Sequence, residues 1–173
     1  VAAPPVQWSR GPSAGIDLLG SAHDPRDAWE ITRLHPLAVH AASGDERAPI
    51  EARRWLAETP PGRGIGWTTA IEAAIRLVSL VRIATGSPHP AFREAIHAHA
   101  VWISRHPSRG TSANNHRVAE LGALALAAHV LDLPAFRPDE LPDVLDAQVH
   151  PDGVGVEQSP SYLAFDLEWA LIA

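Results

Sequence analysis

Proline and glycine divide this chain into segments of helical length, and that division limits its possible folds more than any other feature. Clusters of turn-forming residues occur at 44–45, 60–66, 86–88, 106–110 and 151–155. Between them, apolar residues recur at the spacing of an amphipathic helix, and the alternation of β-branched residues that is typical of strands is missing. The sequence therefore predicts an all-α fold.

Seven helices are expected, over residues 24–42, 46–58, 67–85, 89–104, 114–131, 138–148 and from 160 to the end. Asp24 and Pro25 are typical of a helix start, because the carboxylate caps free N–H groups and proline suits the first helical position. Glu72 and Arg76 are expected to pair on the side opposite the apolar stripe of their helix. Residues 1–23 are expected to form an extended lead-in. The last apolar run ends without a cap, so we expect the sequence to be truncated within this fold.

The expected helices alternate between long or apolar members and short or polar members. This alternation is typical of helical hairpins stacked into an inner and an outer layer, as in an (α/α) toroid or a solenoid. Hairpin neighbours are antiparallel, so all inner helices run the same way and their N-termini gather on one face. The residues there are Trp67 and Thr68, Asn114 to His116, and Ser161 and Tyr162. Free N–H groups and positive dipole ends at that face predict a site for an anionic ligand.

Composition excludes several classes of function. The 173 residues carry a net charge of −6, which argues against nucleic acid as the main partner. No run of eighteen apolar residues predicts a membrane span. Cysteine and lysine are both absent, which excludes thiol nucleophiles, thiolate metal sites and lysine Schiff bases. His97 and His99 point apart on a helix, and neither a metal site nor a cofactor is expected.

Four motifs, taken in order, carry a resemblance to a known family. They are Trp29-Glu30-x-x-Arg33; Thr59 to Trp67 followed by Ile71-Glu72-x-x-x-Arg76; Asn114-Asn115-His116-x-x-x-Glu120; and Asp152-Gly153-x-x-x-Glu157-x-Ser159-x-x-Tyr162. Their order and spacing over residues 24–173 resemble the N-terminal helical (alginate lyase-like) domain of the heparinase II/III-like polysaccharide lyases.

This resemblance implies an incomplete (α/α) toroid followed by a β-sandwich domain, with the active site between them. It implies cleavage of a uronic-acid polysaccharide by β-elimination, without metal or cofactor, in the periplasm or outside the cell. The expected ligand is an anionic polysaccharide or oligosaccharide. The β-sandwich lies outside this sequence, so it is the expected partner domain, and the helical part alone is expected to be inactive.

The resemblance also implies roles for individual residues. The family's Asn-His pair falls on Asn115 and His116, and its catalytic tyrosine falls on Tyr162. When the C5 proton of a uronate is removed, charge builds on the neighbouring carboxylate, and Asn115 and His116 can stabilise it by donating hydrogen bonds. Tyr162 can protonate the leaving oxygen and, in some geometries, also act as the base. Gly66 stands where the family often has Asn, so a substrate contact is expected to be lost there.

Further residues are candidates for substrate binding. They are Arg63 and Arg117 for carboxylates, Trp67 for stacking on a sugar ring, Asn114 beside the catalytic pair, and Glu157. Simpler roles are also open: the two Asn residues can cap a helix, Glu157 can bond to backbone in its glycine-rich loop, and Tyr162 can be a packed aromatic. Trp29, Trp55 and Trp102 are expected in the core.

Two other functions stay open at this point. A toroid glycoside hydrolase would place two carboxylates across the sugar, and the available acids are Glu120, Glu157 and Asp166. A non-catalytic glycan-binding or scaffold domain would need none of these side chains for turnover. The products separate the two enzymes, because a lyase leaves a C4–C5 double bond that absorbs in the ultraviolet.

Overall fold

The computed structural model describes Ile16 and residues 24–173, and helices dominate that part. They are α2 (Pro25–Thr32), α3 (His35–Ala42), α4 (Arg47–Glu58), α5 (Ala70–Gly86), α6 (Pro90–Arg105), α7 (Asn115–Leu131), α8 (Leu141–Asp146) and α9 (Pro160–Ile172), with 3-10 turns η2 (Ile65–Trp67), η3 (Gly110–Ser112) and η4 (Pro134–Phe136). Among these residues there is no strand; the β-type pairing is limited to isolated bridges, such as that between Val149 and Gly155. The all-α prediction is confirmed. The lead-in predicted for residues 1–23 lies, apart from Ile16, outside the described residues.

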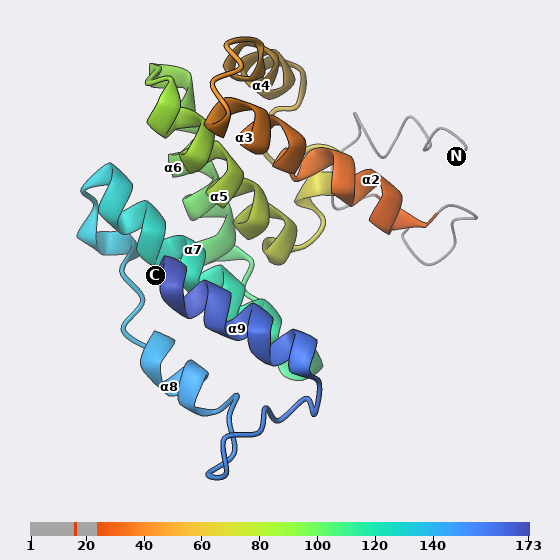
Figure 1. Cartoon of the computed structure of the whole chain (residues 1–173), viewed down its shortest axis with the longest axis vertical. Helices are drawn as coiled ribbons and strands as arrows, with labels where there is room; N and C mark the ends of the chain where they lie inside the picture. The colour runs from red at the N-terminus through yellow and green to blue at the C-terminus, as the bar shows by residue number, and fades with distance from the viewer. Residues whose placement is uncertain (1–15, 17–23) are drawn as a thin grey trace.

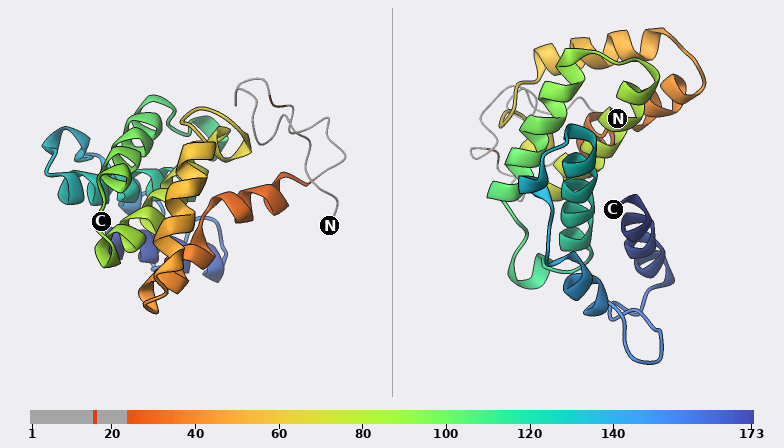
Figure 2. Two further views of the ribbon diagram at one scale, coloured as in Figure 1. Left: turned by 90° about the horizontal axis from the view of Figure 1, so that it is seen from above. Right: turned by 90° about the vertical axis from the view of Figure 1, so that its left-hand side faces the viewer.

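The odd-numbered helices lie side by side in a row, and the even-numbered helices cover it. α3 packs on α5, α5 on α7, and α7 on α9. α4 contacts α3 and α5, α6 contacts α5 and α7, and α8 contacts α7. In the right-hand view of Figure 2, α6 and α9 lie on opposite sides of α7. The N-terminal ends of α5, α7 and α9 all point toward the lower right of Figure 1, so alternate helices run in the same direction.

The helix expected over residues 24–42 is in fact two helices, so that prediction is wrong. Leu34, between α2 and α3, adopts φ 60° and ψ 17°, which is a left-handed conformation. Pro36 explains the break, because proline has no N–H to donate and its ring would clash with the carbonyl of Thr32 in a continuous helix. The buried side chain of Leu34 joins the core at this point.

The core lies between α5, α6 and α7. Its largest fully buried aliphatic and aromatic side chains there are Leu77, Leu80, Ile83, Phe92, Ile96, Ile103, Leu121 and Leu131. α7 is buried around most of its circumference, as its nearly uniform apolar second half predicts. None of the described helices is long and apolar enough to cross a bilayer.

A buried arginine ties the segment before α5 to this core. The guanidinium of Arg76 donates to the carbonyl of Gly66 and to Nε2 of His99, both at 2.8 Å, and lies 4.8 Å from the centre of the Trp67 ring. Because Nε2 of His99 accepts, its Nδ1 carries the proton and donates to the carbonyl of Ala95 at 2.7 Å. Burial lowers the pKa of Arg76 to about 9, against the raising effect of the nearby Glu72 carboxylate.

Glu72 and Arg76 do not form the exposed pair that their spacing predicts. Both side chains are buried. Glu72 instead accepts two hydrogen bonds from Arg33, which follows α2, at 2.7 and 2.8 Å. The polar side of α5 is therefore an internal surface, covered by α2 and η2, and its charges are satisfied by residues distant in sequence.

A glycine allows α9 to approach α7 closely. A Cβ atom at Gly122 would lie 3.0 Å from Cε3 of Trp169 and 3.1 Å from the Trp169 carbonyl oxygen. Trp169 and Asp166 are the two residues that α9 buries. The position of α9, which carries Tyr162, therefore depends on the absence of a side chain at position 122.

Replacing Gly122 by Val is expected to lower the free energy of unfolding by about 1–3 kcal/mol, because the added methyl groups overpack the contact with Trp169. Urea denaturation followed by tryptophan fluorescence measures the change. Gly86→Val is the matched control, since a Cβ at Gly86 comes no closer than 3.8 Å to another atom; its effect is expected to stay within about 1 kcal/mol. Equal losses in the two variants would contradict this account of the α7–α9 contact.

Candidate functional site at the N-termini of α7 and α9

The N-terminus of α7 carries the three consecutive polar residues that the sequence singles out. Asn114 is the N-cap, and its side-chain Oδ1 accepts the backbone N–H of His116 at 3.5 Å. This is the capping role that is common for Asn before an apolar helix. Asn115 is buried, whereas His116 is partly exposed. Asn114 therefore has a structural role, and Asn115 and His116 are held in the first turn behind it.

Glu157 joins the N-terminus of α7 to the segment before α9. Its carboxylate accepts the backbone N–H of Asn115 at 3.5 Å. The loop that carries Glu157 folds back on itself, since Val156 donates to the carbonyl of Gln148 at 2.9 Å and His150 to that of Val154 at 2.8 Å. A carboxylate is favourable at this place because the free N–H groups of a helix N-terminus are the positive end of its dipole.

Tyr162 and Asp166 stand one turn apart on α9 and differ in their surroundings. Tyr162 is 47% exposed, so its hydroxyl is accessible from solvent. Asp166 is only 6% exposed, and its Oδ1 is buried without a hydrogen-bond partner in the described part of the chain. Burial, together with the negative charge of Glu157, raises the pKa of Asp166 to about 6.

Glu120 and Arg117 belong to a structural network on the other side of the first turns of α7. Glu120 is fully buried and accepts hydrogen bonds from the hydroxyl of Ser108 at 2.6 Å and from its backbone N–H at 3.0 Å. Arg117 donates to Glu120 at 3.3 Å and also pairs with Glu140. Glu120 is thus already hydrogen-bonded and is not a free acid for catalysis. Arg117 is already paired with two carboxylates and is not free to bind a substrate carboxylate.

Trp67 and Arg63, two further predicted substrate ligands, lie apart from this site. Trp67 is 1% exposed and packs against Arg76 and Trp102, so it is a core residue and presents no ring face to a sugar. Arg63 is exposed in the loop before η2. Gly66 also has a structural explanation, because a Cβ there would lie 2.7 Å from Nη1 of Arg76.

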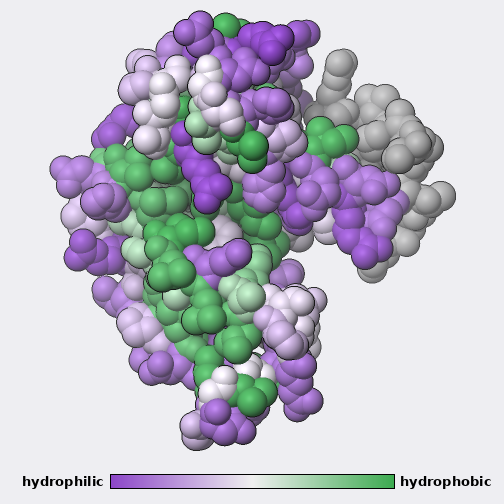
Figure 3. Space-filling view, in the orientation of Figure 1, coloured by the Kyte–Doolittle hydropathy of each residue, from purple (hydrophilic) through white to green (hydrophobic). Residues whose placement is uncertain are grey.

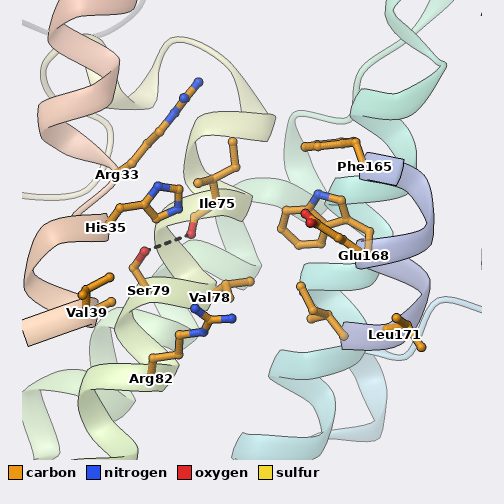
Figure 4. A pocket seen from close by; sticks show the side chains of 13 residues that line it. Arg33, His35, Val39, Ile75, Val78, Ser79, Arg82, Phe165, Glu168 and Leu171 are labelled. Atoms are coloured by element: carbon orange, nitrogen blue, oxygen red, sulfur yellow. Dashed lines mark hydrogen bonds between the residues drawn. The ribbon is translucent and has the colours of Figure 1, made fainter. Parts of the chain in front are cut away.

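A cavity of about 720 Å³ between α3, α5 and α9 lies away from the predicted site residues. Figure 4 shows Arg33, His35 and Arg82 on its α3–α5 side and Phe165 and Glu168 on its α9 side. In Figure 3, which has the orientation of Figure 1, hydrophobic residues gather along the middle of the molecule. The residues that line the cavity include none of those predicted to bind or cleave a substrate.

Asp166 has no role in the lyase reaction predicted from the sequence and is named there only as an acid available to a hydrolase. The sequence does contain a sign that Asp166 is unusual, because it is the one acidic residue in the otherwise apolar stretch 163–167. A carboxylate inside an apolar stretch of helix points either to burial or to a chemical role. In the part of the chain that the structure describes, no group of three or more acidic or histidine side chains is arranged to hold a metal ion.

Comparison of the chain with known proteins gives no assignment. No family model, no curated protein and no solved structure matches it.

Proposed function

We propose that this chain supplies the helical part of the active site of a polysaccharide lyase that cleaves a uronic-acid polymer by β-elimination. The observation that carries the proposal is the meeting of α7 and α9, where Glu157 accepts the N–H of Asn115. This contact holds the turn with Asn115 and His116 next to the segment that leads to the exposed Tyr162. A pair of donors and an accessible phenol beside a helix N-terminus suit the chemistry of an anionic sugar.

In the proposed reaction, the uronate carboxylate accepts hydrogen bonds from Asn115 and His116. These donors stabilise the negative charge that builds on the carboxylate when a base removes the proton from C5. The C5 electron pair then forms the C4–C5 double bond as the C4–O bond breaks. The hydroxyl of Tyr162 donates its proton to the leaving glycosidic oxygen. If Tyr162 also serves as the base, the proton that it takes from C5 is the one that it returns.

The proposal includes the architecture around the site. The row of α3, α5, α7 and α9, covered by α4, α6 and α8, has the alternation of layers that an (α/α) toroid requires, and this supports an incomplete toroid. A β-sandwich domain facing the toroid would supply the rest of the cleft, with an anionic polysaccharide between the two and with action in the periplasm or outside the cell.

A second candidate is a glycoside hydrolase on the same helical scaffold. One observation favours it, since Glu157 and Asp166 are two acids of which one has a pKa raised to about 6, as general acids require. As the group that would protonate the leaving oxygen, Asp166 is only 6% exposed, whereas Tyr162 in the lyase scheme is 47% exposed. The lyase is therefore the function that this geometry supports better.

The nature of the products tests the proposal. The full-length protein is incubated with alginate, heparan sulfate and other uronate polymers, and both ultraviolet absorbance and reducing ends are measured. For a lyase, one unsaturated end is expected for each new reducing end. Reducing ends without absorbance would identify the hydrolase instead. Binding of these polymers without either product would identify a glycan-binding domain.

A further inference from the structure

A single acidic side chain is enclosed where α9 packs against α7. One carboxyl oxygen of Asp166, Oδ1, is buried and has no hydrogen-bond partner among the described residues. The neighbouring residues on α9 are apolar, and Trp169 on the next turn packs against Gly122. An unpartnered buried carboxyl destabilises a fold, and it does so most strongly when it is ionised. Packing alone therefore does not account for an acid at this position.

The elements that pack together here, α7, α9 and the loop before α9, carry several charged groups. On α7, Arg117 and Glu120 bond to each other, and His116 is partly exposed. On α9 itself, Glu168 is exposed. The charge that acts on Asp166 is that of Glu157, which adds to the effect of burial in raising the pKa of Asp166. Asp166 thus has one ionic neighbour of consequence, and it carries the same sign.

The carboxyl groups of Glu157 and Asp166 differ in their surroundings. Glu157 is partly exposed and accepts the N–H of Asn115 at the positive end of α7, where a carboxylate is favourably placed. Asp166 has neither advantage, because it is enclosed and one of its oxygens is unpartnered. Burial and the negative charge of Glu157 therefore both favour the protonated form of Asp166 and raise its pKa.

We propose that Asp166 sets the charge of the candidate site, keeping its proton in mild acid and releasing it to solvent toward neutral pH, and thereby controls how tightly the site holds a uronate carboxylate. When Asp166 is protonated, the pair contributes one negative charge, that of Glu157 at the N–H of Asn115. When Asp166 ionises, a second negative charge opposes the anionic substrate. Asp166 does not touch the sugar, so it is a positioning residue, and this part of the inference rests on the proposed function.

The first test needs no substrate. The carboxyl carbon of Asp166 is followed by NMR as a function of pH in the wild-type chain and in Glu157→Gln, a conservative change that removes the neighbouring charge. The titration midpoint is expected near pH 6 in the wild-type chain and lower in Glu157→Gln. A midpoint near the ordinary value of an aspartate, about 4, in the wild-type chain would overturn the inference.

Stability provides a second readout that does not depend on activity. Because the folded chain binds the Asp166 proton up to about pH 6 and the unfolded chain releases it near 4, the folded state loses stability as the pH rises through this window. The urea midpoint of the wild-type chain is therefore expected to fall between pH 4 and 6 relative to that of Asp166→Asn, which has no such proton. Parallel curves for the two proteins would contradict the proposed protonation.

The third test measures KM for the uronate polymer that the full-length protein cleaves. In the wild-type protein KM is expected to rise about three- to tenfold between pH 5 and 8, as the second charge appears, and in Asp166→Asn this rise is expected to be absent. Loss of kcat in a folded Asp166→Asn variant at every pH would assign Asp166 to the chemical step and overturn the inference. If no polymer is cleaved, the proposed function fails, and the titration and stability measurements still decide whether Asp166 holds the proton.

Discussion

Replacing Tyr162 by Phe is expected to lower kcat of the full-length protein about 10²- to 10⁴-fold, the range for removal of a group that transfers a proton. The change removes one hydroxyl from a side chain that is 47% exposed. The stability of the fold is therefore expected to change by less than about 0.5 kcal/mol. The initial rate of ultraviolet absorbance with a cleaved uronate polymer measures kcat, and thermal unfolding measures the stability.

Leu167→Ala is a matched control on the same helix. Leu167 is 56% exposed and carries no polar atom in its side chain. Its truncation is expected to leave kcat within about twofold, so that a loss confined to Tyr162→Phe identifies the hydroxyl rather than the helix surface. Asn115→Ala provides the second arm, because it removes a proposed donor to the substrate carboxylate. Full activity in both Tyr162→Phe and Asn115→Ala would refute the assignment of the site.

The helical class of the fold could be predicted from the sequence because its signals are local. Proline and glycine clusters end helices wherever they occur, and the apolar stripes between them need no knowledge of tertiary contacts. The same kind of signal is present at the helix break that the prediction missed. Pro36 marks the break between α2 and α3, but it was outweighed by the continuous apolar spacing from Ile31 to Ala41.

The environment of individual polar residues could not be predicted in the same way. The spacing of Glu72 and Arg76 is typical of an exposed pair, yet the partner of Glu72 is Arg33, thirty-nine residues away. Burial of Arg76 also explains why Trp67, which was predicted to stack on a sugar ring, lies in the core instead. The Trp67 ring packs against the Arg76 guanidinium, and that contact exists only after α2, η2 and α5 have come together.

The candidate site was predictable to the extent that it depends on helix direction. Alternation of helix types placed the N-termini of α7 and α9 on one side, as Figure 1 shows for their ends. The contact between Glu157 and Asn115 and the enclosure of Asp166 were not predictable, because they depend on the fold of the loop over residues 148–158 and on the close approach permitted by Gly122.

Arg76→Ala is expected to destabilise the fold by about 3–5 kcal/mol, the cost of removing one member of a buried polar network. The change leaves the Gly66 carbonyl and Nε2 of His99 without their donor and opens a cavity beside Trp67. Urea denaturation followed by tryptophan fluorescence measures the loss, and the tryptophan signal reports on the altered contact directly.

Two further variants separate the causes of that loss. Arg54→Ala is the matched control, because Arg54 is exposed and pairs with Glu58 on the same helix, so its effect is expected to stay within about 0.5 kcal/mol. Arg76→Met fills most of the volume and also removes the cost of burying a charge, so it is expected to lose less stability than Arg76→Ala. A loss in Arg76→Ala no larger than that in Arg54→Ala would show that the guanidinium does not hold η2 and α2 against α5. A larger loss in Arg76→Ala than in Arg54→Ala would mean that the buried Arg76 guanidinium fixes the segment before α5. A side chain at position 66 would collide with this guanidinium, which explains the glycine there.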